Sequence, residues 1–152
     1  MKLTEILSPE RVTSGHTFTS KKKALEELSK LLGQGAGVAA ADILNSLAAR
    51  EKLGSTGLGH GVAIPHGRMA GVSQSVGAFM RLKNALDYDA HDGHGVDLVF
   101  GLLVPQAANE THLKHLAAIA EMFSDEAFCK KLRSAGDDKA LFEMLAAFTP
   151  SN

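Results

Sequence analysis

Apolar residues recur at helical spacing in the first third of the chain. Ser20 precedes the first run and can cap a helix N-terminus with its hydroxyl, and the glycine-rich stretch 33–37 separates this run from a second. Steps of three and four residues are typical of an amphipathic helix. The pattern predicts two helices, with apolar positions Leu25, Leu28 and Leu32 in the first and Ile43, Leu44, Leu47 and Ala48 in the second.

The middle of the chain loses this helical pattern. Residues 54–61 are too rich in glycine for a helix or a regular strand, so we expect a loop with a function rather than a linker. A very short apolar run at 62–64 follows, and strand-like runs follow at 76–82 and 96–104, with an Asp-Gly turn between them at 92–93. The run at 96–104 is almost wholly apolar, which predicts a central strand.

Helical periodicity returns after residue 109 and continues nearly to the end. The apolar positions are Leu113, Leu116, Ala120 and Phe123, then Phe128 and Leu132, and last Leu141, Met144, Leu145 and Phe148. Helices, then strands, then helices predict an α/β fold in which helices cover a small β-sheet. Because the chain has 152 residues and 45% of them are hydrophobic, we expect residues 1–152 to form a single domain.

The charges of the chain nearly cancel, with 16 Lys and Arg against 17 Asp and Glu. No long basic block occurs beyond the lysines at 21–23, which argues against nucleic acid or an anionic membrane as a partner. No signal peptide is apparent, and no apolar run approaches the ~20 residues that cross a bilayer. The single Cys129 is expected to fill the core rather than act as a nucleophile. We therefore expect a soluble protein of the reducing cytoplasm, without membrane insertion.

The sharpest candidate for chemistry is His66, in the sequence Ile-Pro-His-Gly-Arg at 64–68. Pro65 fixes its own φ and favours an extended residue before it, while Gly67 leaves the imidazole accessible. A neutral imidazole is a competent nucleophile near neutral pH and could attack phosphorus without a separate base. The alternative is that His66 merely stands at a tight turn and has no chemical role, and the spacing of these residues fits both interpretations equally well.

A phosphoryl acceptor also needs groups that hold the equatorial oxygens during transfer. Arg50 is the first candidate, because it lies near the end of the second predicted helix and its planar guanidinium suits an oxyanion. A solvated arginine favoured by the helix dipole is the alternative. Gly57 and Gly59 could present backbone N–H groups to the same oxygens, and Ser55 and Thr56 could add hydroxyls. The loop is not a Walker motif, since no Gly-Lys-Ser/Thr follows its glycines.

His112 is the third candidate, because it opens a predicted helix directly after the apolar strand. Ligand sites in α/β sheets gather beyond strand ends, and a histidine there can donate to a phosphate. An exposed polar residue in a first helical turn is the alternative. His115 follows three residues later, and His91 and His94 form a similar pair. Neither pair has a convincing set of carboxylate or thiolate partners, which disfavours a zinc site.

With these residues in view, the sequence resembles the IIA proteins of the bacterial phosphoenolpyruvate-dependent phosphotransferase system, of the fructose/mannitol type and its nitrogen-regulatory branch. The most specific similarity is Arg-Glu-Lys-Leu-Gly-Ser-Thr-Gly-Leu-Gly at 50–59, followed by Gly-Val-Ala-Ile-Pro-His-Gly at 61–67. Supporting similarity occurs at 96–100, 103–105 and 111–113. The resemblance extends over nearly the whole chain.

The resemblance implies that His66 is the phosphorylated residue, and that Arg50 and His112 line the phosphate site as stabilisers. It also implies a mixed sheet flanked by helices. The donor would be a small HPr-like phosphocarrier, itself charged from phosphoenolpyruvate through enzyme I. No metal or organic cofactor is expected.

Within the family, residues 4–7 and the lack of an attached IIB or membrane domain resemble the nitrogen-regulatory branch. Phosphorylation there is mainly a signal to regulatory or ion-transport targets. A sugar-transport component that passes phosphate to a IIB domain is one alternative, and a binding module indifferent to phosphorylation is another. Two positions depart from the family pattern: His60, often asparagine, could add a titrating group beside the site, and Gly95 replaces a common proline.

Overall fold

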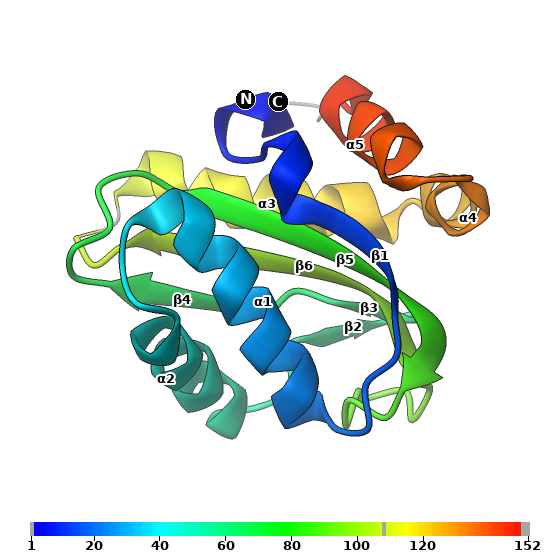
Figure 1. The fold of residues 1–152 in the computed structure, drawn as a ribbon, viewed down its shortest axis with the longest axis horizontal. Coiled ribbons are helices and arrows are strands. Elements are labelled where there is room, and N and C mark those ends of the chain that lie inside the picture. Colours follow the sequence, from blue (N-terminus) through cyan, green and yellow to red (C-terminus); the bar gives the residue numbers. More distant parts are fainter. Residues whose placement is uncertain (1, 108, 150–152) are drawn as a thin grey trace.

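The polypeptide forms a mixed β-sheet between two layers of helices (Figure 1), in a computed structural model that describes residues 2–107 and 109–149. The elements are η1 (Leu3–Glu5), η2 (Pro9–Arg11), β1 (Val12–His16), α1 (Lys21–Ala36), α2 (Ala40–Lys52), β2 (Gly57–Gly59), β3 (Val62–Ala63), β4 (His66–Met69), β5 (Val76–Leu86), β6 (Val96–Pro105), α3 (Glu110–Ser124), α4 (Glu126–Ser134) and α5 (Asp138–Ala147). The predicted α/β fold is confirmed.

β6 lies in the middle of the sheet, whose order is β1-β5-β6-β3-β2 with β4 also paired to β6. β5 and β6 are antiparallel, whereas β1 runs parallel to β5, and β3 and β4 run parallel to β6. β3 pairs at Leu98 and Val99 and β4 pairs at residues 102–105, so the two short strands lie end to end along β6. The central strand predicted at 96–104 is confirmed. β4 has no second strand partner among the described residues, which makes it an edge strand.

Both faces of the sheet are covered, which explains the continuous apolar run in β6. α1 and α2 cover one face, and α3, α4 and α5 cover the other (Figure 1). Alternate side chains of β5 and β6 enter the two cores: Phe79, Leu98, Phe100 and Leu102 on the α3 side, and Ala78, Met80, Val99 and Leu103 on the α1 side. η1 packs against α5 (Figure 1). Cys129 is buried in the core on the α3 side, as expected.

α1 begins where the sequence predicts and ends later. The Ser20 hydroxyl caps it by accepting a hydrogen bond from the N–H of Lys23 at 3.2 Å. The helix continues through Gly33 and Gly35, so the predicted separating stretch 33–37 is wrong except at its last residue. Gly35 is required there because a methyl group at that position would lie 2.6 Å from the guanidinium of Arg11.

The glycine-rich stretch contains a strand, β2, that the sequence did not predict. β2 and β3 form an antiparallel hairpin. His60 and Gly61 connect them with φ angles of 56° and 80°, as the two central residues of a type I′ turn require. β1 and β4 were also missed, because neither has an alternating apolar pattern long enough to be recognised.

The three C-terminal helices are confirmed, and each has a polar cap. The side chains of Asn109, Asp125 and Asp137 accept hydrogen bonds from the backbone N–H three residues later. The predicted turn at 92–93 is present, with φ of 74° at Gly93. Within the described ranges, none of the helices has the length and apolar character that a membrane crossing needs.

Candidate functional site

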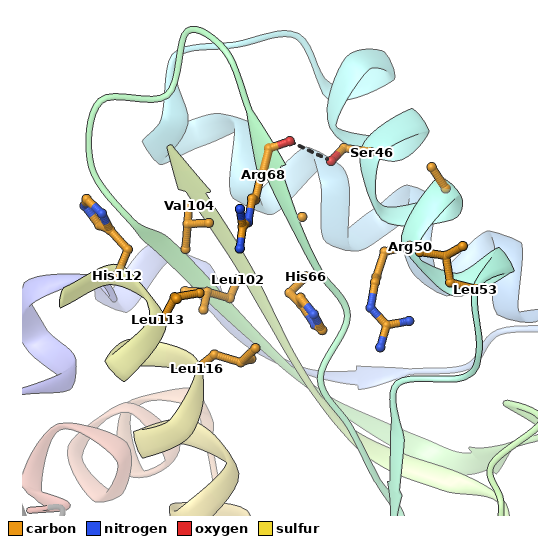
Figure 2. A pocket seen from close by; sticks show the side chains of 12 residues that line it. Ser46, Arg50, Leu53, His66, Arg68, Leu102, Val104, His112, Leu113 and Leu116 are labelled. Atoms are coloured by element: carbon orange, nitrogen blue, oxygen red, sulfur yellow. Dashed lines mark hydrogen bonds between the residues drawn. The ribbon is translucent and has the colours of Figure 1, made fainter. Parts of the chain in front are cut away.

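A cavity of about 420 Å³ opens at the edge of the sheet, between α2, β4 and the first turns of α3 (Figure 2). Its lining comprises Ser46, Ala49, Arg50 and Leu53 from the α2 region, His66, Gly67 and Arg68 from β4, Leu102 and Val104 from β6, and His112, Leu113 and Leu116 from α3. Four separate segments of the sequence therefore meet in one place. The charged side chains in this lining are two arginines, and no carboxylate belongs to it among the described residues.

His66 is the first residue of β4 and is half-buried. The preceding proline is anchored to the sheet, because the carbonyl oxygen of Pro65 accepts a hydrogen bond from the N–H of Leu102 at 3.0 Å. The Nδ1 atom of His66 lies 2.9 Å from the carbonyl oxygen of Ile64. A carbonyl oxygen can only accept, so Nδ1 carries the proton and donates it. The lone pair of the neutral ring is therefore on Nε2, which is the nucleophilic nitrogen.

Arg50 belongs to the last turn of α2 and lies across the cavity from His66 (Figure 2). Its Nη1 donates a hydrogen bond to the carbonyl oxygen of Gly54 at 2.8 Å. That bond satisfies one carbonyl beyond the helix end and orients the guanidinium. The remaining N–H groups have no other partner among the described residues, so they are available to an anion.

His112 lines the same cavity from α3, but its ring lies at the far rim and is turned away from His66 (Figure 2). The reason is local: the N–H of His112 donates to Oδ1 of Asn109 at 3.2 Å, and Nδ1 of His112 accepts from the N–H of Asn109 at 3.3 Å. This reciprocal cap puts the proton of the neutral ring on Nε2, which can act as a donor. The predicted role of His112 as a stabiliser stays a prediction, since it requires the ring to turn.

The predicted loop ligands lie elsewhere: Ser55, Thr56, Gly57 and Gly59 are not part of the cavity lining. The N–H of Thr56 donates to Oε1 of Glu51 at 3.1 Å, and the N–H of Gly57 donates to the Ser55 hydroxyl at 3.1 Å. These two N–H groups are therefore not free for a phosphate. The Ser55 hydroxyl itself donates to the carbonyl oxygen of Tyr88 at 3.2 Å.

A buried polar cluster around Glu51 lies behind the cavity, and the sequence did not predict it. The Glu51 side chain is only 6% exposed, and Oε1 lies 2.9 Å from Nζ of Lys21. Oε2 accepts hydrogen bonds from the hydroxyls of Thr56 and Tyr88. Burial, followed by the adjacent Glu51 charge, raises the pKa of Tyr88 far above its ordinary range. The sequence contained one indication of this cluster, namely a carboxylate directly after Arg50 at the start of the glycine-rich motif.

The other histidines do not join His66. His115 is buried and its Nδ1 lies 2.9 Å from the Ser75 hydroxyl. Burial, and secondarily the charge of neighbouring His112, lowers the pKa of His115. Nδ1 of His60 lies 3.3 Å from Oε1 of Glu126, at a separate cavity of about 330 Å³, so the expectation that it stands beside the site is wrong.

His91 and His94 are exposed on the connection between β5 and β6. The described part of the chain contains no group of three or more His, Cys, Asp or Glu side chains placed to hold a metal ion.

Arg68 lines the cavity and was not recognised as a site residue from the sequence. It lies two residues after His66 on β4, and residues at i and i+2 of a strand share one face. That relationship could have been found only if the short strand had been predicted.

Known proteins are similar to this chain over nearly its whole length. The model of the family described as "Phosphoenolpyruvate-dependent sugar phosphotransferase system, EIIA 2" matches residues 5–147. The nitrogen regulatory protein of Bradyrhizobium diazoefficiens is 40% identical over 146 residues, which are 96% of this chain and 95% of that protein. The crystal structure of the nitrogen regulatory protein IIA-Ntr from Neisseria meningitidis is 42% identical with a TM-score of 0.89, and covers 94% of this chain and 98% of that one.

A further relative is a longer protein, and this chain matches one part of it. The fructose-specific EIIABC component of the Bacillus subtilis phosphotransferase system is 31% identical over 95% of this chain, which spans 23% of that protein. The family model matches nearly the whole chain. The alignment with the Bradyrhizobium protein also covers nearly the full length of both chains. The chain therefore belongs to the EIIA 2 family of the phosphoenolpyruvate-dependent sugar phosphotransferase system.

Proposed function

We propose that the protein accepts a phosphoryl group on Nε2 of His66 from an HPr-like phosphocarrier. The observation that carries the proposal is the hydrogen bond from Nδ1 of His66 to the Ile64 carbonyl oxygen, because it leaves the Nε2 lone pair facing a cavity that also contains Arg50. In the proposed transfer no metal or organic cofactor has a role, because the phosphoryl group passes directly from the donor imidazole to His66. Carrier and acceptor would meet in the cytoplasm.

The transfer step conserves the proton of the acceptor ring. The Nε2 lone pair of His66 forms a bond to phosphorus while the bond from phosphorus to the donor imidazole breaks, and that electron pair returns to the donor ring. His66 keeps its proton on Nδ1, so its ring becomes positively charged as the new bond forms. The Ile64 carbonyl oxygen, 2.9 Å away, stabilises that charge. No general base is needed.

Charge also spreads over the equatorial oxygens of the transferring group. Arg50 would donate to these oxygens from the α2 side of the cavity, and His112 would donate from α3 after a rotation of its ring. Two exposed leucines flank the site, Leu53 at 84% and Leu113 at 48% exposure. An apolar rim of this kind suits contact with a protein donor better than binding of a small free phosphate compound.

The output of the protein would be regulatory. Relatives over the full length of the chain are named nitrogen regulatory proteins, which favours a signal to regulatory or ion-transport targets over passage of phosphate to a sugar. Phosphorylation adds roughly −1.5 to −2 charges at one point, enough to change which partner surfaces fit the apolar and basic rim. A target should then bind the two forms with different affinity, and equal affinity would contradict the switch.

Phosphorylation of the purified protein tests the acceptor. Incubation with phosphoenolpyruvate, enzyme I and the HPr-like carrier should give an acid-labile phosphoprotein. His66→Ala should abolish the label, whereas His94→Ala, which changes an exposed histidine outside the cavity lining, should label like the wild type. Labelling of His66→Ala at the normal rate would overturn the assignment.

A sugar-transport role is the second candidate, and the similarity to the fructose-specific EIIABC component supports it. In that role the phosphorylated protein would pass its phosphoryl group to a fructose-type IIB domain. Rapid and complete transfer to a purified IIB protein would favour transport. Transfer only back to the HPr-like carrier would favour regulation.

A further inference from the structure

The short strand β4 directs two side chains into the cavity. His66 and Arg68 occupy alternate positions, so their side chains leave the same face of the strand, the face shared by Leu102 and Val104 in the parallel register with β6. Gly67, between them, faces α2, where the hydroxyl of Ser46 leaves no room for a methyl group. The strand therefore presents an imidazole and a guanidinium side by side.

The main chain of Arg68 is held, while its guanidinium is not. The hydroxyl of Ser46 donates to the carbonyl oxygen of Arg68 at 3.3 Å, and the backbone pairs with β6 opposite Val104. The side chain is exposed and extends toward His66 (Figure 2). Within residues 2–107 and 109–149, its guanidinium has no hydrogen-bond or ion-pair partner.

The other four arginines of the chain all have partners. Arg11 donates to Gly77 and Ile6 carbonyls, Arg50 to Gly54, Arg81 to Leu132 and Ala135, and Arg133 to Asp97. Three of these guanidiniums hold parts of the fold together, and Arg50 is anchored by one bond at the cavity. The guanidinium of Arg68 lies beside the nucleophilic ring and has no partner among the described residues. Free cations next to a nucleophile point to an anionic ligand.

We propose that Arg68 is a second arginine that binds the phosphoryl group as it reaches His66. This inference rests on the proposed phosphoryl transfer to Nε2. Arg50 already uses one of its five N–H groups on the Gly54 carbonyl, and its planar fork meets two oxygens of a phosphoryl group at a time, which leaves the third equatorial oxygen to another donor. Arg68 approaches from the strand side and Arg50 from the helix side, with His66 between them (Figure 2).

The role of Arg68 is electrostatic and involves no proton transfer. As the phosphorus moves from the donor nitrogen to Nε2 of His66, the bond that forms and the bond that breaks are both nitrogen–phosphorus bonds, and Arg68 keeps all its protons. Its fork would donate to the oxygens in the transition state and to the phosphohistidine product. Arg68 is thereby expected both to speed transfer and to slow hydrolysis of the product.

The test compares Arg68→Gln, Arg68→Lys and a matched control. Lys52→Gln removes an exposed cation from the end of α2 that is not part of the cavity lining. Initial rates of labelling from the phosphorylated carrier should fall about tenfold or more in Arg68→Gln, recover to within a few fold in Arg68→Lys, and stay unchanged in Lys52→Gln. The isolated phosphoprotein should lose its label faster in Arg68→Gln, and its ³¹P resonance should shift.

The outcomes separate this inference from the proposed function. A labelled wild type together with an Arg68→Gln variant that labels and hydrolyses within twofold of it would overturn the role of Arg68 alone. An equal loss of labelling rate in Lys52→Gln would also overturn the role of Arg68, since any positive charge near the cavity would then have the same effect. An unlabelled wild type would overturn both proposals. Because Arg68 is exposed, thermal unfolding of Arg68→Gln should match the wild type.

Discussion

Nζ of Lys21 lies 2.9 Å from Oε1 of Glu51, which joins the first residue of α1 to the end of α2. The same ammonium lies 4.3 Å from the centre of the Tyr88 ring. Glu51 directly follows Arg50, so this contact fixes the backbone that carries the cavity arginine. The cluster is a structural support for the site, and Lys21, Glu51 and Tyr88 do not belong to the cavity lining.

Glu51→Ala should destabilise the fold by about 2–3 kcal/mol, because it leaves Lys21 and the Tyr88 hydroxyl without their buried partner. Urea unfolding measures this difference. Glu143→Ala is the control, since that carboxylate is 64% exposed and pairs only along its own helix, and it should change stability by less than about 0.5 kcal/mol. Equal stabilities of the two variants would show that the cluster contributes nothing.

Arg50→Ala should damage phosphoryl transfer far more than folding. The lost contact to the Gly54 carbonyl is exposed, so unfolding should change by less than about 1 kcal/mol. Loss of one preorganised anion contact should lower the rate constant of labelling by a factor of about 10². Quenched-flow labelling measures this rate constant. A well-folded Arg50→Ala variant with unchanged labelling kinetics would refute the role of Arg50 in transfer.

The tautomer of His66 can be observed directly. With Nδ1 donating to the Ile64 carbonyl at 2.9 Å, the neutral ring should show the Nδ1–H form in ¹⁵N spectra. The phosphorylated protein should carry its phosphorus on Nε2, visible as a ¹⁵N–³¹P coupling. A coupling to Nδ1 would mean that the hydrogen bond to Ile64 breaks before transfer.

His115 should make stability fall on acidification. Burial lowers its pKa in the folded protein, so the unfolded chain binds the proton more readily. Its stabilising contribution is complete above the ordinary value of 6.5 and is lost as the pH falls below it toward the lowered folded pKa. The unfolding free energy should decrease between pH 7.5 and 5.5, and His115→Gln should weaken that decrease.

His94→Gln serves as the comparison for this measurement, because His94 is exposed and outside both cores. It should retain the full pH dependence of the wild type. An identical pH dependence in His115→Gln would show that other groups cause the acid sensitivity.

The sequence predicted His66 and Arg50 as neighbours, and both line the cavity. Each depends on a local feature: a Pro-His-Gly triplet for His66 and a helix end for Arg50. It missed Arg68 because strand periodicity cannot be recognised over the four residues of β4. It misassigned the N–H groups of Thr56 and Gly57 because their partners, Glu51 and Ser55, are selected by the folded loop. The start of a helix was predicted correctly where a capping residue stood directly before an apolar stripe, as Ser20 does before α1.

The packing of η1 against α5 has a consequence for how the domain can be built into larger proteins. These two elements bring the first and last parts of the described chain together, and neither contributes a residue to the cavity around His66. A tether attached next to η1 or α5 would therefore start away from the cavity around His66. The domain can thus be fused or linked to a companion module without obstructing the opening of the cavity around His66.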